Sequence, residues 1–128
     1  MALGTRPASP LTRDDSRKRA ENLSVSVSIS PTSPVAGSTT QIRFVLEPAD
    51  GIEKYLGAWG HMLAVSDDLI DMLHTHSLIA DGSPQMQFSL IFPRARTYRL
   101  CAQFQRRGVV NMAHFDIPVR PLYSGTAK

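Results

Sequence analysis

The sequence has only one cysteine, Cys101, so the 128-residue chain cannot form an intrachain disulfide. It has no apolar run of the ~18–20 residues that a membrane-spanning helix needs, and no secretion signal is visible after Met1. It also lacks the nucleophile-elbow, phosphate-loop and zinc-protease motifs. We therefore expect a protein that is not an enzyme and has no membrane span in this chain. If the protein is exported, its signal or anchor is missing from this sequence.

Excess positive charge is confined to the two ends of the chain. Of the net charge of +3, residues 1–21 and 120–128 each contribute +2, whereas residues 22–119 contribute −1. Five arginines could form a basic patch, but the aromatic residues near them alternate to the inward face, where they cannot stack on bases. We therefore expect no nucleic-acid partner. The five are Arg94, Arg96, Arg99, Arg106 and Arg107.

The composition divides the chain into one domain and two tails. Residues 1–21 are rich in proline, serine, arginine and aspartate and lack hydrophobic periodicity, which is typical of a disordered leader or linker. Residues 120–128 are interpreted as a disordered tail. The domain predicted between them spans residues 22–119, which is long enough for one hydrophobic core but not for two.

Short alternating apolar runs separated by turn formers fill this domain, and no segment predicts a helix. The pattern predicts an all-β fold, an immunoglobulin-like or cupredoxin-like antiparallel β-sandwich of about seven strands. Tyr98, near the start of one strand, either makes a tyrosine-corner hydrogen bond or simply packs in the core. The predicted strands are 23–29, 39–46, 55–65, 69–76, 86–92, 97–105 and 109–119.

Three of the four histidines, His61, His74 and His76, lie in one predicted hairpin. A turn centred on Asp67 and Asp68 would place His61 directly opposite His74, and side chains opposite each other share a face. His74 and His76, two residues apart, share that face as well. A slip of one residue would instead move His61 to the other face. The aspartates of the turn, which include Asp71, are expected to be solvated rather than catalytic.

Three imidazoles on one face are a ligand set that copper and zinc both accept. The alternative is that the histidines only pack or form hydrogen bonds in the sandwich. Met62 and Met72 lie near them, and although thioethers suit Cu(I), both methionines are interpreted as core residues. The residues alone leave both readings of the histidines open.

A second constellation lies on the last predicted hairpin. If Arg107 and Gly108 form its turn, Cys101 falls opposite His114, and Met112 lies on the same outward face. Cysteine, histidine and methionine are the ligands of blue-copper sites. However, the closely spaced ligand loop of cupredoxins is missing, so Cys101 is interpreted as an ordinary strand residue.

Three segments give the chain a resemblance to a group of small secreted bacterial β-sandwich domains. They are Tyr55 to His61 (YLGAWGH), His74 to His76 (HTH) and Tyr98 to Phe104 (YRLCAQF). The group typically has YLGAxGH, HxHP and YRLxxQF at these places, and the resemblance covers roughly residues 23–119. Ser77 replaces the usual proline, and His114 stands where a small residue is common.

Members of this group are often found with heavy-metal or copper-handling proteins. The resemblance therefore implies a periplasmic or secreted domain with a role in metal handling. Together with the histidine hairpin, it favours an exported domain that binds copper or zinc through His61, His74 and His76. The alternative is a structural or protein-interaction module that binds no metal.

Overall fold

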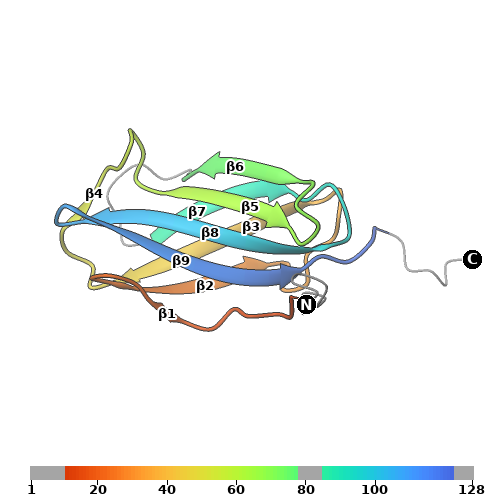
Figure 1. The fold of residues 1–128 in the computed structure, drawn as a ribbon, viewed down its shortest axis with the longest axis horizontal. Coiled ribbons are helices and arrows are strands. Elements are labelled where there is room, and N and C mark those ends of the chain that lie inside the picture. The colour runs from red at the N-terminus through yellow and green to blue at the C-terminus, as the bar shows by residue number, and fades with distance from the viewer. Residues whose placement is uncertain (1–10, 78–84, 123–128) are drawn as a thin grey trace, which may run out of the picture.

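Residues 11–77 and 85–122 are described by the computed structural model, and they form two antiparallel sheets packed face to face (Figure 1). One sheet has the strand order β1-β2-β3-β7. In the other, the order is β9-β8-β5-β6, and β4 pairs with the end of β8 beyond β5. The strands are β1 Lys18–Arg19, β2 Ser24–Ser30, β3 Thr39–Glu47, β4 Ile52–Glu53, β5 His61–Ser66, β6 Met72–His76, β7 Gln85–Ile91, β8 Thr97–Arg106 and β9 Val109–Pro118.

All seven strands predicted from the sequence are present, and the all-β sandwich is confirmed. The packing of β2-β3-β7 against β9-β8-β5-β6 has the strand order of an immunoglobulin-like sandwich. Strands β5 and β6 begin later than predicted, because residues 55–58 and 67–70 form turns. The short strands β1 and β4 were not predicted. No helix in the described ranges is long and apolar enough to cross a membrane.

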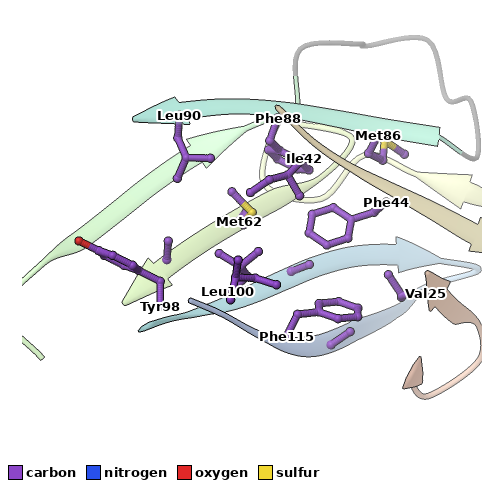
Figure 2. Close-up of a cluster of buried hydrophobic side chains, with 14 of the residues drawn as sticks. Val25, Ile42, Phe44, Met62, Met86, Phe88, Leu90, Tyr98, Leu100 and Phe115 are labelled. Atoms are coloured by element: carbon purple, nitrogen blue, oxygen red, sulfur yellow. The ribbon is translucent and has the colours of Figure 1, made fainter. Parts of the chain in front are cut away.

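The core lies between the sheets, and in β3, β7 and β8 it is built by strict alternation of buried and outward-facing side chains. In β8, every second side chain from Tyr98 to Phe104 is fully buried, and the residues between them face outward. Figure 2 shows how side chains from both sheets meet around Phe44. The Phe44 ring centre lies 5.5 Å from that of Phe88 and 5.7 Å from that of Phe115. Aromatic pairs at these separations add to the stabilisation that burial provides.

The ordered structure extends beyond the domain limits predicted from composition. Within the predicted leader, β1 pairs with β2, and Asp14 exchanges two backbone hydrogen bonds with Asp116 of β9. Residues 11–21 therefore contact strands of both sheets. At the other end, Arg120 exchanges backbone hydrogen bonds with the loop at residues 34–36. Of the disordered segments predicted at 1–21 and 120–128, residues 1–10 and 123–128 lie outside the described part of the chain.

Tyr98 fixes one end of the sandwich through its hydroxyl group. The ring is fully buried, the hydroxyl donates to a carboxylate oxygen of Asp71 at 2.7 Å, and it accepts the backbone N–H of Arg94 at 3.3 Å. The second bond reaches back four residues, as in a tyrosine corner. Burial of the ring, together with the bond to Asp71, raises the pKa of Tyr98 to about 12. The tyrosine-corner bond and the core packing therefore both occur.

Arginines and aspartates pair around this buried hydroxyl. Arg94 contacts Asp68 at 2.8 Å and Asp71 at 2.9 Å, and Arg96 contacts Asp67 at 2.8 Å. The acidic turn is therefore neutralised by ion pairs and is not simply solvated. The other three arginines of the suggested basic patch are paired as well: Arg99 with Asp116, and Arg106 and Arg107 with Asp50.

We expect Tyr98→Phe to lower the free energy of unfolding by about 1–3 kcal/mol, because it removes both bonds and leaves the Arg94 N–H without this acceptor. Urea unfolding at neutral pH measures the loss. Tyr55→Phe removes a hydroxyl from a half-buried ring and serves as the control, with a smaller expected cost. Equal losses in the two variants would contradict the role assigned to the Tyr98 hydroxyl.

The acidic turn predicts how stability depends on pH. A hydrogen bond from Ser66 and the ion pair with Arg94 lower the pKa of Asp68 to about 2. A carboxylate whose pKa is lower in the folded state stabilises the fold above its unfolded-state pKa, and this stabilisation is lost as pH falls toward the folded-state pKa. The difference in unfolding free energy between wild type and Asp68→Asn should therefore be largest above pH ~5 and shrink between pH ~4 and ~2.

Urea unfolding across this pH range measures that difference. Asp15→Asn is the control, because Asp15 forms an exposed ion pair with Arg13 and exposed pairs contribute little to stability. A difference for Asp68→Asn that stays constant with pH would show that the turn does not depend on the ionised carboxylate.

Candidate metal-binding face

The candidate ligands lie on the outer face of the sheet that contains β5, β6, β8 and β9. In β5, Met62 and Ala64 are fully buried, so His61, Leu63 and Val65 point away from the core. Cys101 and His114 point outward for the same reason, because their neighbours along β8 and β9 are buried. One sheet face therefore presents His61, His74, Cys101 and His114.

The register of the histidine hairpin differs by two residues from the one predicted. His61 pairs with His76, and Leu63 pairs with His74, whereas the sequence placed His61 opposite His74. A slip of one residue would have moved His61 to the other face, but a slip of two keeps the faces unchanged. The predicted placement of His61 and His74 on one face therefore holds, although the predicted pairing is wrong.

A longer loop causes this difference. Ser66 donates its backbone N–H to Asp71, so residues 67–70 form the loop, rather than Asp67 and Asp68 alone. The Ser66 hydroxyl donates to Asp68 at 2.6 Å and accepts the backbone N–H of Asp71 at 2.9 Å. These side-chain bonds add to the backbone bonds of Ser66 with Leu69 and Asp71 across the loop. Leu69, at a φ of 62°, completes the loop.

His61 is the one buried histidine among those whose side chains the structure describes. Only 7% of its surface is exposed, and its Nε2 lies 2.6 Å from the backbone oxygen of Tyr55. Because a carbonyl oxygen only accepts, Nε2 carries the proton of this bond. The ring centre of His61 lies 5.7 Å from that of the exposed His74, with 29° between the ring planes. The two rings are therefore close neighbours on the outer face.

A tight turn supplies the carbonyl that orients His61. Tyr55 and Ala58 exchange two backbone hydrogen bonds, and the two residues between them have positive φ angles, 51° at Leu56 and 84° at Gly57. Positive φ at both central positions is the geometry of a type I′ turn. Gly60 then brings the chain against the core, since a Cβ at this position would lie 2.8 Å from the Phe104 ring. The YLGAWGH segment thus has a structural role that the sequence analysis did not predict.

The register places the backbone of His76 beside His61. The side chain of His76 lies outside the described part of the structure, as do residues 78–84. Among the residues that are described, no group of three or more histidine, cysteine, aspartate or glutamate side chains is arranged to hold an ion. A three-histidine site would therefore depend on His76.

The last hairpin agrees with the predicted register. Cys101 pairs with His114 and Gln103 pairs with Met112, and Arg107 and Gly108 form the turn with φ angles of 48° and 76°. Cys101 is partly buried, and burial raises the pKa of its thiol. His114 is exposed. The second constellation of the sequence analysis is therefore on one face, as predicted.

The two methionines of the first hairpin have different surroundings. Met62 is fully buried in the core, as predicted, whereas Met72 is 67% exposed and faces outward from β6. The prediction of a core position for Met72 is therefore wrong. Met72 lies two residues before His74 and therefore shares its outward face, where it pairs with Val65.

Comparison with known proteins assigns a family. Residues 18–121 match the family described as Domain of unknown function (DUF8832). The match covers most of the chain, which therefore belongs to this family, and the chain itself folds as an antiparallel sandwich. No curated protein and no solved structure matches the chain. The family description states no function, so the metal-handling role implied by the resemblance remains a prediction.

We expect Gly60→Ala to lower the free energy of unfolding by about 1–3 kcal/mol, because the added methyl group overpacks the core. Gly60 has no positive φ angle, so the cost comes from the contact with Phe104 and not from backbone strain. Thermal or urea unfolding measures it. In a Phe104→Leu background the cost of Gly60→Ala should fall, and an unchanged cost would show that this contact is not its cause.

Proposed function

We propose that this protein is a non-enzymatic, exported module that binds a transition-metal ion, copper rather than zinc, through His61, His74 and His76. The observation that carries the proposal is the close approach of the His61 and His74 rings on one outer face, with His61 oriented by the Tyr55 carbonyl. The exported location rests on the resemblance to secreted bacterial sandwich domains.

The hydrogen bond of His61 supports a ligand role. Histidines that bind metals usually donate the ring N–H remote from the metal to a carboxylate or a backbone carbonyl, which fixes the tautomer and the ring orientation. His61 makes such a bond from Nε2 to Tyr55. Its ligating atom would then be Nδ1.

The spacing of the two rings is also compatible with a shared ion. With Zn–N bonds of ~2.0–2.1 Å, two imidazoles on one tetrahedral ion have ring centres about 5 Å apart. The 5.7 Å between His61 and His74 is close to this separation, so small rotations of the exposed His74 ring would suffice. His76, whose backbone pairs with His61, would supply the third imidazole.

A protein-interaction module is the second candidate. It is favoured by the β5–β6 loop, where Leu69 and Ile70 are 77% and 71% exposed. The ion pairs of Asp68 and Asp71 with Arg94 hold this loop in place. Exposed apolar side chains on an ordered loop are typical of protein-binding surfaces, and such a role would require no metal.

A Cu(II) titration separates the two candidates. It is done in a Cys101→Ser background, so that the thiol neither reduces the ion nor binds it. We expect one ion per chain with a dissociation constant of about 1 μM or tighter, which corresponds to roughly −8 kcal/mol. His74→Ala should weaken binding at least about tenfold, which is ~1.4 kcal/mol. The same titration with Zn(II) compares the two metals.

His114→Ala in the same background is the matched control, because His114 is the one histidine outside the hairpin. It should leave the dissociation constant unchanged. Binding weaker than micromolar, or binding that His74→Ala does not affect, would overturn the metal proposal and leave the interaction module as the better reading. Circular dichroism of each variant checks that the fold is retained.

A further inference from the structure

The structure places three soft or borderline metal ligands together on the outer face, on β8 and β9, and β8 pairs directly with β5 of the histidine hairpin. Cys101 of β8 pairs directly with His114 of β9, and Met112 lies two residues before His114 on the same face. Side chains directly opposite in an antiparallel pair have Cβ atoms ~4.5–5.5 Å apart, and diagonal neighbours are within reach of long side chains. We propose that Cys101, His114 and Met112 form a binding site for a monovalent soft cation such as Cu(I) or Ag(I).

The burial of the three residues suits such a site. His114 is exposed and Met112 is 45% exposed, although methionine is ordinarily a core residue. Both residues line one shallow surface depression beside β1. Cys101 does not line the depression, but it is only partly buried and pairs directly with His114, which does. An ion can therefore reach the ligands from solvent.

The chemistry of the ligand set selects the ion. Thiolate and thioether sulfurs select Cu(I) over harder divalent ions, and imidazole accepts copper as well. Binding converts the Cys101 thiol and one monovalent cation into a cation–thiolate bond and one released proton, with no change in oxidation state. The product is electrically neutral at the ligands, because the thiolate charge balances that of the ion.

Most of the charged groups around the site do not oppose a cation, because four of them form two ion pairs. Arg99, two residues before Cys101 on β8, makes two hydrogen bonds to Asp116 at 2.8 and 3.0 Å. Lys18 of β1 lies 2.6 Å from Asp14. The remaining charged side chain that lines the depression is Arg19. A neutral complex, unlike a divalent ion, fits beside this one further positive charge.

The site is independent of the one proposed for the histidine hairpin. Leu63 of β5 lies between Cys101 and His74 in the sheet, since it pairs with both of them. Two strand spacings of ~4.8 Å therefore separate the two backbones. The two sites share no residue, so either can be absent while the other is present.

A titration with Ag(I) tests the site, because Ag(I) is stable in air and needs no reductant. We expect the 128-residue chain to bind one Ag(I) through Cys101, with release of one proton, measured by calorimetry in buffers of different ionisation enthalpy. Equimolar Ag(I) should also protect Cys101 from alkylation. Cys101→Ser should abolish this binding.

Any accessible thiol binds Ag(I), so the other two ligands decide the result. We expect His114→Ala and Met112→Leu each to weaken Ag(I) binding at least tenfold. Met72→Leu is the matched control, because Met72 is exposed on the same sheet face but lies on β6, and His74→Ala is the control for the histidine hairpin. Neither should change the affinity.

Wild-type affinity in both His114→Ala and Met112→Leu would overturn the proposal and identify Cys101 as an isolated thiol. The changes at Met72, His74, Met112 and His114 lie on exposed side chains. Circular dichroism should therefore show the native fold in each of these four variants. A failed Cu(II) titration at the histidine hairpin would not bear on this result, since that experiment is done without Cys101.

Discussion

The alternation of side chains along β8 is the constraint on which the rest of the structure depends. β8 is hydrogen-bonded on both sides, to β9 along its whole length and to β5 and β4 on the other side. Its inward residues, every second one from Tyr98 to Phe104, fill the core, and its outward residues include Arg99 and Cys101. A one-residue shift of β8 would bury Arg99 and Cys101 and expose the aromatic rings. The core therefore fixes the register of the candidate metal-binding face.

The two ends of the sandwich are stabilised in different ways. At one end, Tyr98 and the arginines after β7 join the β5–β6 loop to the core, so that the loop keeps Leu69 and Ile70 exposed on an ordered backbone. At the other end, the turn at Tyr55 and the close packing of Gly60 orient His61. The ends thus hold the two features on which the functional candidates rest, an apolar loop and a pair of histidine rings.

The outer face of the β9-β8-β5-β6 sheet combines residues that are individually ordinary. Each histidine could be a surface residue, and Cys101 could be a simple strand residue. Our metal-binding proposals rest on the gathering of these residues on one face. The neighbouring arginines Arg94, Arg96 and Arg99 are paired with aspartates. Proximity in the sequence explains only part of this gathering, since Cys101 and His114 lie side by side only because β8 pairs with β9.

By itself, the sequence determined the all-β class, the seven main strands and the inward faces of β3, β7, β8 and β9, because alternation with period two is a local property of the chain. It also determined the last hairpin, since a two-residue turn at Arg107 and Gly108 leaves one register. The tertiary structure decided the pairing of His61, because the length of the 67–70 loop depends on the bonds of Ser66 and Asp68 and on Arg94, which comes from a distant part of the chain. It also decided how residues 11–21 pack on the sandwich. These residues have no periodic pattern of their own and are held by backbone bonds to β2 and β9. Contacts between residues far apart in sequence decide such features, and no local pattern encodes them.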